Sequence, residues 1–154
     1  MSDAKASGDQ LAAGDLKPGE VLAERTVILS KGTFDAFASL TGDNHPIHDD
    51  VAYAAARGLR APIAHGLLLV AMTALGATPI SDRLHASMVA MVGTEAKFIG
   101  PAYLDDAVKL ELRVGEIVPK SKGVSLVRFD IELSSEARQV LACVSHRFLL
   151  KTTL

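Results

Sequence analysis

The sequence predicts an α+β domain in which a curved antiparallel sheet wraps around one apolar helix, and two patterns support this prediction. Residues 66–77 are apolar on every side of a helix, with Thr73 as the one polar interruption. A helix that is apolar all round has to be covered on all sides. Apolar and polar residues alternate over 108–114 and 127–133, as in antiparallel strands with one packed and one solvated face. Such strands are suited to cover the helix.

Length and composition are typical of one globular domain. The chain has 154 residues, of which 49% are apolar, and a formal net charge of −2. It contains no run of Lys and Arg, which argues against nucleic acid or a membrane surface as partner. Cys143 is the only cysteine, which excludes an intrachain disulfide and favours a cytoplasmic location. We expect a flexible N-terminal tail over 1–18 and a single domain over 19–154.

Capping and turn residues divide the rest of the chain into short elements. Besides the two strands and the helix named above, we expect strands over 21–29, 87–98 and 140–150, and a helix over 32–40. Ser30 is placed to cap that helix at its N-terminus, and Gly42 ends it. Asp49 or Asp50 is placed to cap a second, short helix that ends near Arg57.

One polar loop carries residues suited to acid-base chemistry. Asp43 and His48 follow the expected helix end, with four residues between them, and Pro46 stiffens the chain between the two. A carboxylate and an imidazole that reach the same water can remove its proton and return one elsewhere, and histidine titrates near neutrality. On spacing alone, capping residues with solvated side chains explain the loop equally well.

Three segments resemble motifs of the MaoC-like, (R)-specific enoyl-CoA hydratases. The segment 41–50 reads TGDNHPIHDD, 61–68 reads APIAHGLL, and 97–103 reads KFIGPAY. The first two are similar to the family pattern Gly-Asp-x-Asn-Pro-x-His, followed by an apolar residue, His and Gly at the start of the central helix. The third resembles a later Lys-Phe-x-x-Pro-Val stretch. The resemblance extends from about residue 21 to the C-terminus and implies the hotdog fold, in which a sheet wraps a central helix.

The resemblance also implies roles for individual residues. Asp43 and His48 match the catalytic pair that activates water for addition to C3 of a trans-2-enoyl thioester. Gly66 matches the position whose backbone N–H faces the thioester carbonyl. A free N–H at a helix start is suited to stabilise the enolate oxygen. The chain departs from the pattern at His45, which replaces the usual Asn before Pro, and we expect His45 to orient the loop or tune the reaction.

The resemblance further implies an acyl-CoA thioester substrate and no cofactor or metal, with coenzyme A as part of the substrate. We expect a homodimer or a dimer of dimers, because the strand over 140–150 carries apolar residues on both faces, which favours an edge or an interface. The positive charges that could meet the coenzyme A phosphates are scattered, and their spacing does not decide between binding and solubility: Arg57, Arg60, Lys97 and Arg113.

Structural explanations remain open for the other histidines. We interpret His65 as a helix-start residue with its ring bonded to backbone, His146 as a satisfied core or edge histidine, and His85 as solvated. A metal site formed by the aspartates and histidines of 43–50 is the less favoured interpretation. The metal enzymes that carry a similar His-Asp pair are all-helical, whereas the second half of this chain is predicted to be sheet.

Two other functions remain as alternatives to hydration. The first is a non-catalytic MaoC-like module that binds an acyl group or serves in an assembly. The second is a hotdog thioesterase, which needs a carboxylate on or beside the central helix, whereas residues 66–77 contain neither Asp nor Glu.

Overall fold

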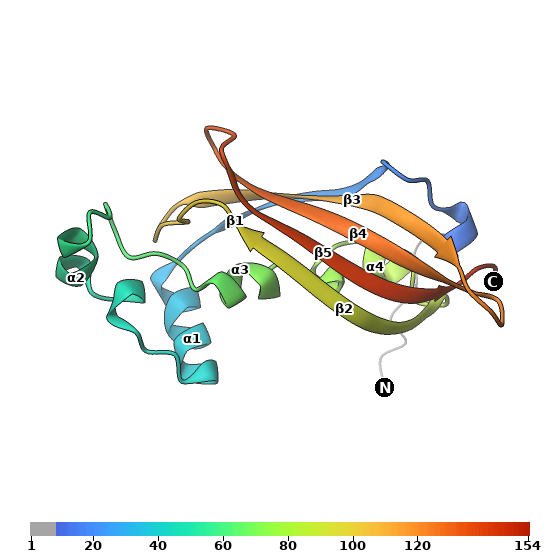
Figure 1. Cartoon of the computed structure of the whole chain (residues 1–154), viewed down its shortest axis with the longest axis horizontal. Coiled ribbons are helices and arrows are strands. Elements are labelled where there is room, and N and C mark those ends of the chain that lie inside the picture. Colours follow the sequence, from blue (N-terminus) through green and yellow to red (C-terminus); the bar gives the residue numbers. More distant parts are fainter. Residues whose placement is uncertain (1–8) are drawn as a thin grey trace.

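The computed structural model describes residues 9–154. Five strands form one antiparallel sheet, and short helices lie on one side of it (Figure 1). The strands are β1 (Val21–Ile28), β2 (Met88–Phe98), β3 (Ala107–Pro119), β4 (Val124–Ser135) and β5 (Val140–Lys151). The α-helices are α1 (Lys31–Thr41), α2 (Val51–Ala56), α3 (Gly66–Ala71) and α4 (Ile80–Arg83), and the 3-10 helices are η1 (Ala13–Asp15), η2 (Pro46–His48) and η3 (Leu75–Ala77).

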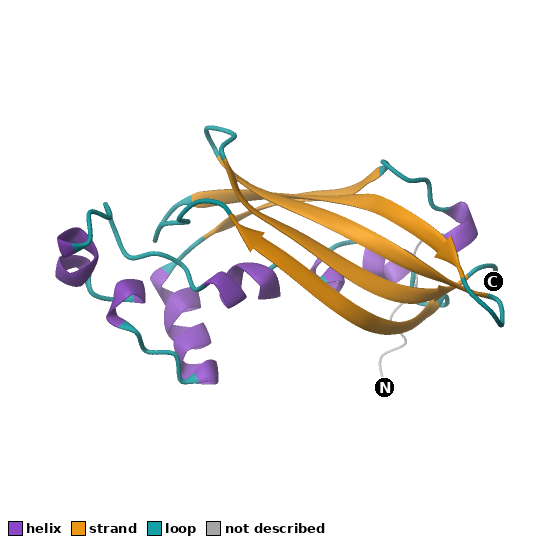
Figure 2. Ribbon diagram, in the orientation of Figure 1, coloured by secondary structure: helices purple, strands orange, loops and turns teal. Residues whose placement is uncertain are grey.

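The strand order in the sheet is β1-β3-β4-β5-β2, with every neighbouring pair antiparallel. The predicted alternation is confirmed in β3 and β4, where every second residue is buried over 108–114 and 127–133. Figure 2 shows the twisted, curved sheet with α3 beneath it, while α1 and α2, labelled in Figure 1, lie toward and beyond one end of the sheet. The predicted α+β class and the curved antiparallel sheet are therefore confirmed.

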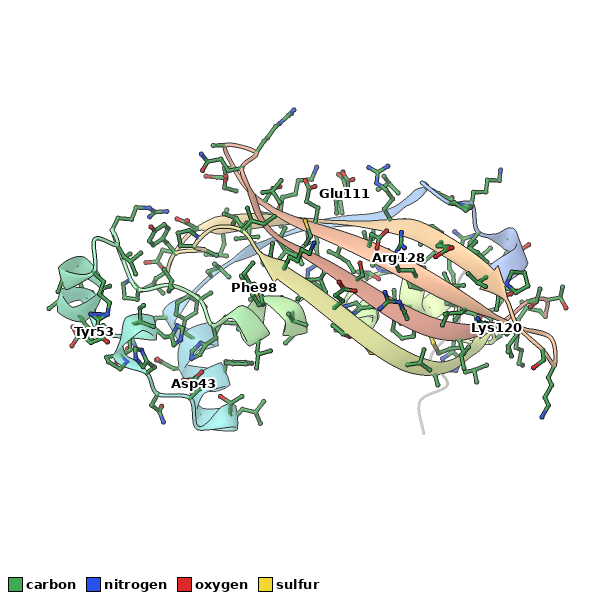
Figure 3. All side chains as sticks on the ribbon, viewed as in Figure 1. Asp43, Tyr53, Phe98, Glu111, Lys120 and Arg128 are labelled. Atoms are coloured by element: carbon green, nitrogen blue, oxygen red, sulfur yellow. The ribbon has the colours of Figure 1, made fainter. Side chains whose placement is uncertain are left out.

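The hydrophobic core lies between the inner face of the sheet and the helices. Phe129 at the centre of β4 is fully buried, as are Leu133 and Val108. Leu68 and Leu69 of α3 are buried against the same cluster. The outer face of the sheet is polar, and its charged side chains pair along and across the strands (Figure 3), as in the bond from Arg128 Nε to Asp130 Oδ1 at 2.9 Å.

The prediction of one helix over 66–77 that is buried on all sides is wrong in two respects. Helix α3 ends at Ala71, and a turn separates it from η3. The Thr73 hydroxyl donates to the Val70 carbonyl over 2.6 Å, a local bond that competes with helix continuation. Leu67 is 70% exposed, so the sheet of one chain covers only part of the helix surface.

The flexible tail expected over 1–18 needs correction where the structure describes it, and residues 1–8 lie outside the described part. Ala12, Ala13 and Leu16 are buried. The Gly14 N–H donates to the Thr152 carbonyl over 3.0 Å, and a Cβ at residue 14 would lie 2.9 Å from that oxygen. This segment packs against the sheet end because its small side chains allow close backbone contact.

Of the two explanations offered for the last strand, an edge or an interface, the edge is wrong, because β5 lies between β4 and β2. The edge beside it is β2, and apolar side chains are exposed along this strand and just after it: Val89, Met91, Val92, Phe98 and Ile99. Within residues 9–154, no helix has the length and apolar character needed to cross a membrane.

Candidate active site

Helix α1 precedes the polar loop, and both of its ends carry the caps that the sequence predicts. The Ser30 hydroxyl accepts from the Thr33 N–H over 3.2 Å at the helix start. Gly42 ends the helix with φ of +77°, in the left-handed region that glycine adopts without strain. The chain therefore reverses direction immediately before Asp43.

Hydrogen bonds within the loop hold it in a single tight turn. The Asp43 carboxylate accepts from the His45 N–H over 3.4 Å, and His45 Nδ1 accepts from the Ile47 N–H over 3.2 Å. Pro46 occupies the first turn of η2, where its missing N–H is not needed. Asp50, one of the two predicted candidates, caps α2 by accepting from the Tyr53 N–H over 3.0 Å.

The His48 ring is held in one tautomer. Its Nδ1 lies 2.7 Å from the Ile63 carbonyl oxygen, which can only accept, so Nδ1 carries the proton and Nε2 keeps a free lone pair. The Ile63 N–H in turn donates to the Ile47 carbonyl over 3.2 Å. Burial lowers the pKa of His48 from its ordinary value, a bond to the Ile63 carbonyl opposes this shift, and nearby His65 adds to it. The neutral, proton-accepting form is thereby favoured.

His65 connects the loop to the start of α3. Its Nε2 donates to the Asp43 carbonyl over 3.0 Å, which confirms the predicted bond to backbone. The ring stacks on that of His48 with a centroid separation of 3.7 Å and an interplanar angle of 22°. His65 Nδ1 is buried without a hydrogen-bond partner among the described residues. The sequence indicated the backbone bond but contained no signal for the stacking.

Gly66 is the first residue of α3, directly after His65. Groups at this position have no partner within the helix, and no hydrogen bond from the Gly66 N–H is found within residues 9–154. A Cβ at residue 66 would lie 2.9 Å from Cζ of Phe98, so any other residue here requires the Phe98 ring to move.

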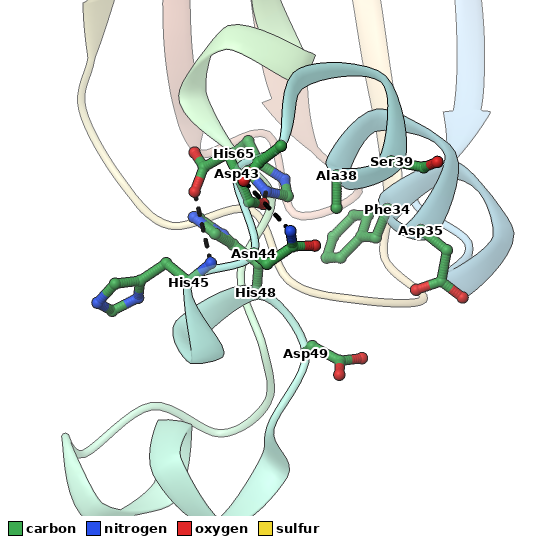
Figure 4. A pocket seen from close by; sticks show the side chains of 11 residues that line it. Phe34, Asp35, Ala38, Ser39, Asp43, Asn44, His45, His48, Asp49 and His65 are labelled. Carbon is green, nitrogen blue, oxygen red and sulfur yellow. Dashed lines mark hydrogen bonds between the residues drawn. The ribbon is translucent and has the colours of Figure 1, made fainter.

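The polar loop and His65 border a pocket of about 530 Å³ beside α1 (Figure 4). Asp43, His45, His48 and His65 lie along one side, and Phe34 and Ala38 of α1 lie along the other. The structure thus brings together Asp43, His48 and His45 in one pocket. Gly66 is not part of its lining but follows His65, which is.

Asp43, His48 and His65 form the cluster that comes nearest to a metal site in the described part of the chain, with candidate ligand atoms within 4.8 Å of one another. Zinc needs each imidazole nitrogen at about 2 Å, with the ion in the ring plane. The two rings are nearly parallel and 3.7 Å apart, so their in-plane lone pairs do not converge on one ion. The arrangement does not fit a zinc centre.

The remaining histidines match their structural interpretation. His146 is 3% exposed and bonds Thr73 Oγ1 through Nε2 at 2.7 Å and Thr94 Oγ1 through Nδ1 at 3.0 Å. Burial lowers its pKa from the ordinary value. His85 is exposed.

Two of the basic residues named as possible phosphate contacts already have acidic partners. Arg60 binds the Asp106 carboxylate at 2.6 and 2.7 Å, and Arg113 pairs with Glu111 on the outer face of the sheet. Arg57 stacks on the Tyr53 ring, beside the loop.

A family model described as MaoC like domain matches residues 16–136. The chain belongs to this family. Three curated relatives of the MaoC-like chain are acyl-CoA enzymes by name. The enoyl-CoA hydratase ChsH3 of Mycobacterium tuberculosis is 30% identical over 100 residues, covering 61% of this chain and 34% of the relative. The 3-hydroxybutyryl-CoA dehydratase of Methylorubrum extorquens is 26% identical over 98 residues, covering 64% and 60%.

The third relative is the (R)-specific enoyl-CoA hydratase of Aeromonas caviae, 33% identical over 79 residues that cover 51% of this chain and 57% of the relative. The MaoC-like chain therefore matches from about a third to 60% of the length of these curated relatives.

Solved structures confirm the predicted hotdog fold. The monoamine oxidase regulatory protein of Archaeoglobus superposes with a TM-score of 0.86 at 22% identity, covering 96% of this chain and 99% of that one. The R-hydratase PhaJ1 of Pseudomonas aeruginosa superposes with a TM-score of 0.70 at 26% identity, covering 92% and 86%. The first likeness, below 25% identity, concerns the fold alone.

Proposed function

We propose that this protein adds water to trans-2-enoyl-CoA thioesters to form (R)-3-hydroxyacyl-CoA, or removes it in the reverse direction. The observation that supports this most strongly is the bond from His48 Nδ1 to the Ile63 carbonyl, because it leaves Nε2 as a proton acceptor beside the Asp43 carboxylate. The family membership and the hydratase names of its relatives agree with the proposal.

In this proposal, Asp43 and His48 bind one water molecule in the pocket. His48 Nε2 takes a proton as the water oxygen bonds to C3, the C2=C3 electron pair moves toward the thioester, and an enolate forms. A proton is then delivered to C2 from the same acid-base pair, which restores the thioester. Acid-base catalysis of this kind contributes about 10² to 10⁴ in rate.

The Gly66 N–H stabilises the enolate oxygen in the proposed reaction. It starts a helix, where the dipole favours negative charge, and it has no partner in the described chain. Loss of one such donor costs about 3 kcal/mol of barrier. The thioester itself makes C3 electrophilic, so the proposal includes coenzyme A as part of the substrate and no cofactor or metal.

We propose a homodimer, with the edge strand β2 facing a second copy of the chain. Val89, Met91 and Val92 are each at least half exposed on this strand, and Leu67 of α3 is 70% exposed. Apolar groups in that concentration at a sheet edge are suited to burial against another protein surface. A cytoplasmic location is part of the proposal and agrees with a chain that has a single cysteine.

The test follows purified protein with trans-2-enoyl-CoA of four to eight carbons, by loss of the absorbance of the conjugated thioester and by chiral analysis of the product. We expect loss of absorbance, no release of free thiol, and the (R)-3-hydroxyacyl product. Release of free thiol would instead identify a thioesterase. Absence of both reactions at every chain length would support the acyl-binding or assembly module.

A further inference from the structure

His45 holds the turn that carries His48 by two separate hydrogen bonds. Its ring Nδ1 accepts from the Ile47 N–H over 3.2 Å, and its backbone carbonyl accepts from the His48 N–H over 3.1 Å. The three-residue helix η2 that follows is too short to be stable in isolation, so bonds such as these help to fix it. Only Pro46 and Ile47 separate His45 from His48, so the cap acts close to the His48 ring.

The side-chain bond depends on the protonation state of His45. An imidazole nitrogen accepts a hydrogen bond only when it carries no proton, and the charged ring is a donor at both nitrogens. Protonation therefore places an N–H of the ring against the N–H of Ile47, and the cap is lost. No second acceptor for the Ile47 N–H is found among residues 9–154.

Charged and titratable groups near His45 are also affected when its ring is protonated. The Asp43 carboxylate accepts from the backbone N–H of His45 and attracts a charged ring, which competes with the role proposed for Asp43. The His48 ring lies edge-on at 6.2 Å between centroids, so a positive charge on either ring disfavours a charge on the other. The other titratable groups near the ring are Tyr53 of α2, at 5.5 Å between centroids, Arg57 stacked on Tyr53, and Asp49, which borders the same pocket.

We propose that His45 is a positioning residue whose uncharged ring caps η2 and so helps to hold His48 in place, and whose protonation removes that cap. This inference rests on the proposed function only for its kinetic consequence, since the cap itself is a property of the folded chain. His45 does not touch the reacting atoms in this account.

The kinetic test compares three variants over pH 5 to 9. His45→Asn keeps an acceptor at the same place without a titrating group, His45→Ala removes the acceptor, and His85→Asn changes an exposed histidine elsewhere. At pH 8 we expect kcat of His45→Ala to fall about tenfold, because a misplaced catalytic group lowers the rate. We expect His45→Asn to recover most of that loss, because its side chain can still cap η2. His85→Asn is expected to behave as wild type.

The pH profile separates positioning from simple support of the fold. On the acid side, log kcat is expected to fall more steeply in the wild type than in His45→Asn, because protonation removes both the cap at His45 and the proton acceptor at His48. In His45→Asn only the protonation of His48 contributes. Equal slopes in the two proteins would overturn the proposal.

A measurement without substrate keeps the proposal testable if the hydratase assignment fails. In ¹⁵N-labelled protein, the Ile47 amide signal is expected to shift upfield in the same titration step as the His45 ring, and to lose this step in His45→Asn. An Ile47 amide that does not follow His45 would overturn the inference, whatever the enzymatic result.

Discussion

The rings of His48 and His65 stack face to face, 3.7 Å apart at their centroids, although the two residues come from different elements. His65 also donates to the Asp43 backbone carbonyl, so one buried side chain contacts both members of the proposed catalytic pair. The start of α3, which carries Gly66, is thereby tied to the loop that carries Asp43 and His48.

Replacing the stacked ring is expected to change the titration of His48. In His65→Leu, the opposing ring charge is removed while the apolar side chain keeps the site buried, so one of the causes that lower the pKa of His48 is lost. We expect the pKa of His48 to rise toward the ordinary histidine value, measured by NMR titration of its ring protons. In the control His85→Leu, the His48 titration is expected to match wild type, and a match in His65→Leu would contradict the account.

Adding one methyl group at Gly66 is expected to disturb the site through Phe98. The new Cβ would lie within 3.2 Å of three atoms of the Phe98 ring. Because this ring is 53% exposed and can turn aside, we expect a cost of at most about 1 kcal/mol in unfolding free energy. Gly76→Ala is a matched control, because a Cβ there meets nothing within 4 Å. The double variant Gly66→Ala/Phe98→Ala is expected to relieve the clash. Denaturant titration of Gly66→Ala, Gly76→Ala and the double variant beside the wild type measures the change in unfolding free energy that each one causes.

Acid is expected to destabilise the fold partly through His146. Burial lowers its pKa, so the unfolded chain binds more protons than the folded one as the pH falls below about 6.5. Stability is therefore fully retained above that pH and is lost as the pH falls toward the folded-state value, by up to about 1.4 kcal/mol per pH unit. His146→Gln, which can bond both threonines but does not titrate, is expected to show a shallower loss between pH 7 and 5. If stability fell with pH equally in His146→Gln and in the wild type, His146 would not be a cause of the acid destabilisation.

The proposed dimer predicts opposite results for two exposed apolar residues. Val92→Arg places a charge on the edge strand β2, and we expect sedimentation to report the mass of one chain. Leu40→Arg changes a side chain of α1 that is 84% exposed, and we expect the mass of the wild type. A wild-type mass for Val92→Arg would place the interface elsewhere.

Local signals predicted most of the fold because each acts over a few residues. The alternation in β3 and β4, the Ser30 cap, the glycine that ends α1 and the Asp50 cap all appear as predicted. The continuous helix over 66–77 was wrong, since apolar composition does not reveal that the Thr73 hydroxyl bonds the Val70 carbonyl. The order of strands could not be read from the chain, because β2 pairs with β5 across a long sequence separation.

The candidate site was predicted in part. Asp43, His45 and His48 were identified from one loop, and the structure brings them to one pocket. The contact of His65 with His48 needed the tertiary structure, because it depends on how the start of α3 packs against the loop. The fixed tautomer of His48 likewise depends on the Ile63 carbonyl, fifteen residues further along the chain.

The central claim is that Asp43 and His48 perform acid-base chemistry on bound water. The most direct measurement is kcat for hydration of trans-2-enoyl-CoA by wild type, Asp43→Asn and His48→Gln, with substrate affinity measured in parallel. We predict that each variant folds, binds the thioester with little change, and loses about 10² to 10⁴ in kcat. Wild-type kcat in either folded variant would contradict the claim.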